Sequence, residues 1–259
     1  MTRKRTFVIG DIHGMRLEFE ELVEKCGYRQ DVDRLILVGD LCDRGPDSAG
    51  CVRYAKEIGA ELAIGNHDDK YLRYRRHEQK KTHTGRKNYK NPMRLPPEKQ
   101  EVWDSLTDDD LDYIESGKYC VPVWEYNALV VHAGVLPGPY PDRREREEYI
   151  FTRYVHKDTH RLLALGPNFS QPPDSIYWTE IYDGTATIVY GHHVRSMTEP
   201  IIETNDKGGR TIGIDTGAPF GGMLTCVVFN TDGSEEYFHV QSKKTWRQHQ
   251  VGTKDKNGR

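Results

Sequence analysis

Short apolar runs that end in glycine-flanked polar residues are the feature that most constrains this chain. Three of them occur early in the sequence and lead into Gly10-Asp11-Ile12-His13-Gly14, Gly39-Asp40-Leu41-Cys42-Asp43-Arg44-Gly45 and Gly65-Asn66-His67-Asp68. Brief runs that are rich in β-branched residues and closed by glycine and polar residues are typical of buried strands. We therefore expect a strand at each place, with a polar loop directly behind it.

Amphipathic segments separate these three runs. Residues 15–26 and 48–58 carry apolar side chains at helical spacing, and Ser48 is the predicted cap of the second segment. The chain thus begins with strand, helix, strand, helix and strand, which predicts an α/β sheet.

Three later apolar runs, 128–131, 187–190 and 211–214, also end at polar residues, namely His132, Gly191-His192 and Asp215. In α/β sheets, ligands bind outside the carboxyl ends of the strands. We therefore expect the polar residues behind the six runs to meet at one edge of the fold.

The chain of 259 residues suits one large domain, which we place at residues 1–240. Residues 73–118 differ in character, because Arg73–Lys99 holds ten basic residues against two acids. Two helices are expected there, one starting near Pro96-Pro97 and one running from a Thr107 cap to Gly117. We interpret this stretch as a basic helical insertion, and we expect residues 241–259 to form a disordered polar tail.

The overall charge excludes some classes of protein. The net charge is −3, from 37 Lys and Arg against 40 Asp and Glu, which argues against a general nucleic-acid or membrane-surface binder. The five cysteines are scattered and form no C-x-x-C pair, so a reducing cytoplasm is the expected location. No apolar run approaches the length of a bilayer, and we expect no membrane partner.

The polar residues at the predicted strand ends have the chemistry of metal ligands. The set combines carboxylates, imidazoles and one amide oxygen: Asp11, His13, Asp40, Asn66, His132 and His192. Such a set suits Mn²⁺, Fe²⁺ or Zn²⁺, and Asp40 is central enough in order and type to bridge two ions. Two ions about 3.5–4 Å apart share a water that becomes hydroxide and attacks phosphorus in line.

Three further residues would complete such a reaction. Arg44 can hold two phosphate oxygens at once, which a lysine does less well. His67 directly follows the ligand Asn66 and is the predicted general acid for the leaving oxygen. Asp43 could orient His67 and hold it protonated. A metal-dependent phosphoester hydrolase is therefore expected.

At these residues the chain resembles the calcineurin-like metallophosphoesterases of the phosphoprotein phosphatase family. The matching motifs are GDIHG, GDLCDRG, GNHD, VHAG and YGHH, within residues 6–240. The resemblance implies a four-layer αββα sandwich, in which two mixed β-sheets are flanked by helices. It also implies that Asp11 and His13 hold one ion, that Asp40 bridges, and that Asn66, His132 and His192 hold the second ion. Nickel is then a further alternative, with Mn²⁺ expected first.

The segment from Gly213 to Thr225 resembles the bacterial and phage branch, which includes bis(5′-nucleosyl)-tetraphosphatases and phage-type protein phosphatases. A second phosphate-binding arginine is usual in this family, and Arg153 is the residue we assign to it. Hydrolysis of dinucleoside polyphosphates or related nucleotides is the leading expectation, and a Ser/Thr (or Tyr) protein phosphatase is the alternative. Removal of phosphate from RNA ends, with Arg73–Lys99 contacting the nucleic acid, and a non-catalytic binding module are the remaining hypotheses.

Overall fold

The first of two large sheets is built around the amino-terminal strand. The computed structural model describes residues 4–83, 89–138, 142 and 144–247. The sheet has the order β13-β12-β1-β2-β3, and its strands are β1 (Thr6–Ile9), β2 (Arg34–Leu37), β3 (Glu61–Leu62), β12 (Met223–Phe229) and β13 (Glu235–Gln241). β1, β2 and β3 run parallel, while β12 is antiparallel to both β1 and β13. The carboxyl ends of β1, β2 and β3 therefore point to one edge.

The second large sheet has the order β10-β11-β9-β5-β4. Its strands are β4 (Cys120–Val123), β5 (Ala128–Val131), β9 (Thr187–Tyr190), β10 (Ile201–Thr204) and β11 (Arg210–Gly213). β5, β9 and β11 run parallel, and the two edge strands are antiparallel to their neighbours. Both sheets are therefore mixed.

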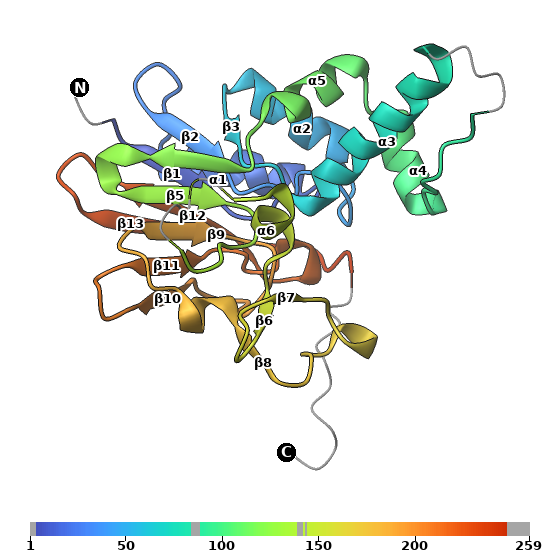
Figure 1. The fold of residues 1–259 in the computed structure, drawn as a ribbon. Coiled ribbons are helices and arrows are strands. Elements are labelled where there is room, and N and C mark those ends of the chain that lie inside the picture. Colours follow the sequence, from blue (N-terminus) through green and yellow to red (C-terminus); the bar gives the residue numbers. More distant parts are fainter. Residues whose placement is uncertain (1–3, 84–88, 139–141, 143, 248–259) are drawn as a thin grey trace.

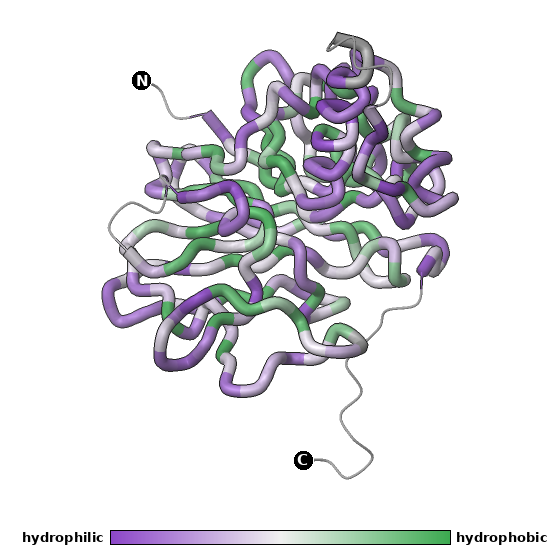
Figure 2. Tube along the Cα trace, turned by 45° about the vertical axis from the view of Figure 1, so that its right-hand side comes forward, coloured by the Kyte–Doolittle hydropathy of each residue, from purple (hydrophilic) through white to green (hydrophobic). Residues whose placement is uncertain are grey.

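The two sheets pack face to face through small aliphatic side chains. Val8 and Ile36 of the first sheet share one buried cluster with Val130 and Val189 of the second. Alternation along each strand sends the other side chains to the outer faces. Figure 2 shows the hydrophobic positions gathered along the strands in the middle of the molecule.

Helices cover the outer face of the first sheet. They are α1 (Arg16–Cys26), α2 (Ser48–Glu57), α3 (Asn66–His83), α4 (Pro97–Ser105) and α5 (Asp108–Ser116). Phe19 of α1 and Val52 of α2 are buried in one cluster with Phe7 and Leu35 of the sheet. Figure 1 shows α3 and α4 at one end of this layer.

The outer face of the second sheet is covered by smaller elements. They are α6 (Arg146–Phe151) and a three-stranded sheet of order β7-β6-β8, with β6 (Tyr154–His156), β7 (Leu162–Leu163) and β8 (Ser175–Tyr177). The described residues also form the 3₁₀ turns η1 (Trp124–Tyr126), η2 (Pro167–Phe169), η3 (Trp178–Ile181) and η4 (Ala218–Phe220). The predicted arrangement of two mixed sheets between outer layers is confirmed.

Local signals set the ends of α4 and α5. Thr107 caps α5 with a reciprocal pair of hydrogen bonds, because its hydroxyl accepts from Asp110 N while the Asp110 carboxylate accepts from Thr107 N. α4 begins at Pro97 with Pro96 before it, as the paired prolines predict. The rings of Tyr74 and Trp103 meet edge to face at 4.8 Å and join α3 to α4.

Two expectations need correction. Ser48 does not cap α2, because the Asp47 carboxylate accepts from Gly50 N at 2.8 Å while the Ser48 hydroxyl accepts from Asp43 N at 2.9 Å. The predicted disorder does not hold for residues 241–247, because Ser242 N donates to Gly222 O and Trp246 N donates to Pro219 O. The rest of that tail lies outside the described residues.

In the described part of the chain, no helix is both long and apolar enough to cross a bilayer.

Candidate metal centre

The predicted ligands come together where the parallel strands of both sheets end. The loops behind β1 and β2 carry Asp11, His13 and Asp40, and the first residue of α3 is Asn66. His132 directly follows β5, and His192 follows β9 after one glycine. Hydrogen bonds and close approaches join all six residues across the two sheets.

The loops that carry these residues turn sharply. His13, Asp40 and His192 have left-handed backbones with φ of 47°, 53° and 71°. Such positions cost about 1–3 kcal/mol each and cluster at functional sites. A Cβ on Gly65 would lie 2.2 Å from Asp40 Oδ1, and one on Gly191 would lie 1.9 Å from Asp11 Oδ1. The motif glycines therefore let the carboxylates approach the backbone.

Asp40 lies between two groups of ligands and faces both. Its Oδ2 is 3.3 Å from His13 Nε2, and its Oδ1 is 3.5 Å from His132 Nε2. His132 Nε2 is in turn 2.9 Å from Asn66 Oδ1 and 3.1 Å from His192 Nδ1. Burial opposes ionisation of Asp40, but the neighbouring histidines and Arg44 outweigh it and hold its pKa below the ordinary value. This geometry suits a bridging carboxylate.

The rings of His13 and His132 present lone pairs to this centre. His13 Nδ1 donates to Cys42 O at 2.8 Å and His132 Nδ1 donates to Val38 O at 3.0 Å, because a carbonyl oxygen can only accept. Burial lowers the pKa of His13, His132 and His192, so these imidazoles are neutral at pH 7. The Nε2 atoms of His13 and His132 therefore carry no proton. His13 Nε2 is buried and has no hydrogen-bond partner, as expected of an atom that binds a cation.

Asp11 and Asp215 are two further buried carboxylates at this centre. Both oxygens of Asp11 accept from His192 N, at 3.0 and 3.1 Å, and Oδ2 is 3.8 Å from His13 Nε2. Burial, together with the charges of Asp215 and Asp40, raises the pKa of Asp11 well above its ordinary value. Burial also raises the pKa of Asp215 to about 6, and its Oδ2 has no partner. Bound cations would relieve this crowding of buried carboxylates, so the residues present fit a metal centre.

Asp215 is a member of the site that the motif analysis left without a role. It directly follows the run at residues 211–214, so its place behind a strand was the signal that could have identified it.

His67 and Asp43 form a hydrogen-bonded pair next to this centre. His67 Nδ1 donates to Asp43 Oδ2, which leaves His67 Nε2 3.9 Å from Asp40 Oδ2. By distance alone, His67 joins His13 and Asp40 as a group that could hold a metal ion. The bond to Asp43 favours the proton-donor assignment, because an orienting carboxylate is what a catalytic histidine requires.

Two arginines flank the centre. Arg44 Nη2 is 3.4 Å from His67 Nε2, and the guanidinium lies over the ring of Phe220 at 5.0 Å. Arg153 Nη2 is 3.0 Å from His192 Nε2 and also donates to His192 O at 3.3 Å. Both predicted phosphate-binding residues are thus placed at the edge of the metal cluster.

Three residues that support the site had no role in the motif analysis. Asp68 is fully buried, and its Oδ1 accepts from the backbone N atoms of Leu41 and Cys42 at 3.0 and 3.2 Å. Tyr71 and Lys99 both donate to the Asp43 carboxylate. Asp68 lies inside a motif and could have been noticed, but no local pattern marks a partner that lies 56 residues from Asp43, as Lys99 does.

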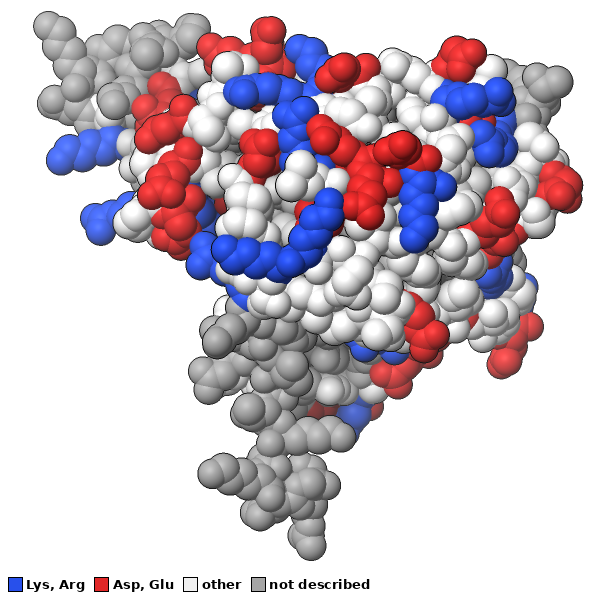
Figure 3. All heavy atoms as spheres, turned by 180° about the vertical axis from the view of Figure 1, so that it is seen from behind, with Lys and Arg blue, Asp and Glu red and all other residues white. Residues whose placement is uncertain are grey.

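The basic stretch is partly neutralised within the fold. Arg73 pairs with Asp69 at 2.8 Å, and Arg75 pairs with Asp112 at 2.6 Å. The side chains of residues 81–88 lie outside the described part of the chain. Figure 3 shows basic and acidic side chains interspersed on the face opposite to that of Figure 1. A nucleic-acid contact through Arg73–Lys99 stays a prediction.

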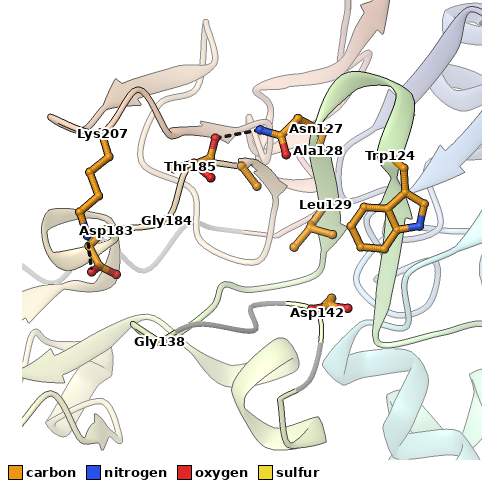
Figure 4. A pocket seen from close by; sticks show the side chains of 11 residues that line it. Trp124, Asn127, Ala128, Leu129, Gly138, Asp142, Asp183, Gly184, Thr185 and Lys207 are labelled. Atoms are coloured by element: carbon orange, nitrogen blue, oxygen red, sulfur yellow. Dashed lines mark hydrogen bonds and ion pairs between the residues drawn. The ribbon is translucent and has the colours of Figure 1, made fainter.

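A cavity of about 570 Å³ lies elsewhere and is lined in part by Trp124, Leu129 and Thr185 (Figure 4). Leu129 belongs to the start of β5, and Thr185 precedes β9. The cavity is therefore at the amino ends of the strands whose carboxyl ends lead to His132 and His192. It is separate from the metal centre.

Comparison with known proteins agrees with this geometry. Residues 4–196 match the model of the calcineurin-like phosphoesterases. The chain is 30% identical over 234 residues to bis(5′-nucleosyl)-tetraphosphatase PrpE (asymmetrical) of Bacillus thuringiensis strain Al Hakam, covering 85% of this chain and 88% of the relative. It is 31% identical over 235 residues to the protein of the same name from Geobacillus thermodenitrificans strain NG80-2, with the same coverage of 85% and 88%.

Solved structures share the fold. One described as a candidate diadenosine tetraphosphatase has a TM-score of 0.68 and 26% identity, covering 91% of this chain and 93% of that chain. A serine/threonine phosphatase from Saccharomyces cerevisiae has a TM-score of 0.54 and 16% identity, and the match covers 94% of this chain and 82% of that chain. At this identity the likeness supports the fold alone. Taken with the ligand geometry, the family match identifies this chain as a member of the calcineurin-like phosphoesterases, which makes it a metal-dependent phosphoester hydrolase.

Proposed function

We propose that this hydrolase uses a binuclear metal centre to cleave dinucleoside polyphosphates. The observation that carries the proposal is the position of Asp40, whose two oxygens face separate groups of ligand atoms from the two sheets. The substrate class is supported by the relatives above, whose names describe tetraphosphatases of bis(5′-nucleosyl) compounds.

In this proposal each ion has its own ligands. Asp11 and His13 hold one ion, Asn66, His132 and His192 hold the other, and Asp40 contributes to both. When bound, the ions, which we expect to be Mn²⁺, lower the pKa of a water molecule and neutralise phosphoryl oxygens.

Side chains of the protein bind the phosphate and transfer the proton. Arg44 and Arg153 bind phosphoryl oxygens from two sides of the centre, because a guanidinium can donate to two oxygens at once. His67 transfers a proton from Nε2 to the leaving oxygen. Arg44 Nη2 lies 3.4 Å from Nε2 and a guanidinium can only donate, so Arg44 turns from this nitrogen toward the phosphate when Nε2 carries the proton. Asp43 accepts from Nδ1 throughout and so keeps the ring oriented while the proton at Nε2 is lost and regained.

The proposal is tested with metal-free protein reconstituted with Mn²⁺. Activity is measured on diadenosine tetraphosphate, a phosphopeptide and a 3′-phosphorylated oligonucleotide, with bound metal determined by mass spectrometry. We expect two ions per chain and the highest kcat/KM for diadenosine tetraphosphate. A higher kcat/KM for the phosphopeptide or the oligonucleotide would replace the substrate assignment, and full activity with one ion per chain would refute the binuclear centre.

A further inference from the structure

The Asp43 carboxylate is held by donors from two helices. Tyr71 of α3 donates its hydroxyl to Oδ1, while His67 Nδ1 and Lys99 Nζ both donate to Oδ2. Only 5% of the Asp43 side chain is exposed. The carboxylate that orients His67 is therefore enclosed by protein groups.

Lys99 reaches this carboxylate from the helical insertion. It lies in α4, and its Nζ is also 3.4 Å from His67 Nδ1. Its side chain is only 17% exposed, so the ammonium is packed against the site rather than extended into solvent. The edge-to-face contact of Tyr74 with Trp103 fixes α4 against α3, the helix that carries His67.

The contact between Lys99 and Asp43 places a positive charge next to a buried negative one. A buried carboxylate needs a counter-ion, and Tyr71 brings no charge. His67 Nδ1 and Lys99 Nζ both donate to Asp43 Oδ2, so the ammonium lies beside the bond that orients the imidazole. Burial raises the pKa of Asp43, but the hydrogen bonds and charges of His67 and Lys99 outweigh it, so the pKa lies below the ordinary value. Lys99 therefore brings a positive charge to this carboxylate from α4, whereas His67 and Tyr71 reach it from α3.

We propose that Lys99 is a positioning residue, whose ammonium holds the Asp43 carboxylate against the His67 ring, so that the insertion supports proton transfer. This inference rests on the proton-donor role proposed above for His67. The competing role for Lys99 is direct binding of a substrate phosphate, for which it would have to leave Asp43. The two roles predict different kinetic changes.

The test compares Lys99→Met, Lys99→Arg and the control Lys56→Met in the Mn²⁺-loaded enzyme. Lys56 pairs with Asp109 at 3.8 Å on the surface, so its replacement removes an ion pair of the same type away from the site. Substrates are phenyl phosphate, whose leaving group needs a proton, and 4-nitrophenyl phosphate, whose leaving group barely does. If Lys99→Met does not fold, Lys99→Gln takes its place.

For Lys99→Met we expect kcat on phenyl phosphate to fall by about 10–100-fold, the usual effect of losing a supporting contact at an active site. KM and bound metal should stay unchanged, and the loss on 4-nitrophenyl phosphate should be much smaller. Lys99→Arg should retain most of the activity, because arginine keeps the charge, and Lys56→Met should match wild type. Equal losses on both substrates, a change confined to KM, or no recovery in Lys99→Arg would overturn the proposal.

A double mutant separates this inference from the proposed function. If Lys99 acts through His67, adding Lys99→Met to His67→Asn should cause no further loss. An additional loss of the full size in that background would show that Lys99 acts elsewhere. If His67→Asn alone slows both substrates equally, the proton-donor role itself is refuted. If His67→Asn depends on the leaving group and Lys99→Met does not, the inference on Lys99 alone is refuted.

Discussion

Asp40 is the residue at which the two groups of proposed metal ligands meet. Because its two oxygens face different ligand groups, Asp40→Asn should weaken both ions, whereas His13→Asn or Asn66→Ala should weaken one. Metal content per chain, measured beside activity on an aryl phosphate, checks this expectation. Retention of two ions with near-full turnover in Asp40→Asn would exclude the bridging role.

His67 differs from its neighbours, because its Nδ1 is hydrogen-bonded to Asp43 and its Nε2 lies 3.4 Å from Arg44 Nη2. His67→Asn should therefore leave metal binding intact and slow turnover by about 10²–10⁴, the usual contribution of a positioned general acid. The loss should be smaller for 4-nitrophenyl phosphate than for phenyl phosphate. Loss of one ion in this variant would instead make His67 a ligand, as its distance to His13 and Asp40 also allows.

At the scale of elements, the short helix α5 depends on its first turn. The Thr107 hydroxyl accepts from Asp110 N, and Arg53 of α2 in turn bonds the Asp110 carboxylate. Thr107→Ala should lower the free energy of unfolding by about 1 kcal/mol, the typical cost of losing such a cap. Urea denaturation measures the change, and the conservative Thr107→Ser should restore it. A loss below a few tenths of a kcal/mol would mean that contacts of Arg53 alone hold this helix end.

At the scale of the whole molecule, the proposed metal ligands come from both sheets. Asp11, His13 and Asp40 follow strands of one sheet, and His132 and His192 follow strands of the other. Ions that bind only the folded state add about 2.7 kcal/mol of stability per site at 100 times Kd. We therefore expect a chelator to lower Tm and added Mn²⁺ to restore it. Asp40→Asn is the control, because its Tm should respond little to either. Equal shifts in wild type and Asp40→Asn would place the stabilising ions elsewhere.

The sequence by itself determined the α/β class and the set of residues at the strand ends. β5 and β9 have the predicted bounds, and Thr107 caps its helix as expected. These features are local, because each motif lies within a few residues of its strand and each cap bonds within one turn. Parallel strands then bring their carboxyl ends to one edge, so the ligands could be grouped without a structure.

Only the tertiary structure decided which groups support those residues. Lys99 and Asp43 are far apart in the chain and meet because α4 packs against α3. No periodic pattern of residues in the sequence predicts which helices pack together in this way. Serine and aspartate are both common helix caps, so the sequence left Ser48 and Asp47 as equal candidates for α2. In the structure the Ser48 hydroxyl accepts from Asp43 N, and Asp47 therefore serves as the cap. Residues 242–247 are likewise held in place by backbone hydrogen bonds to the loop at Pro219 and Gly222. Spacing along the chain predicts where a strand or helix ends, but the partners of a buried charge are set by side chains that meet only in the folded molecule.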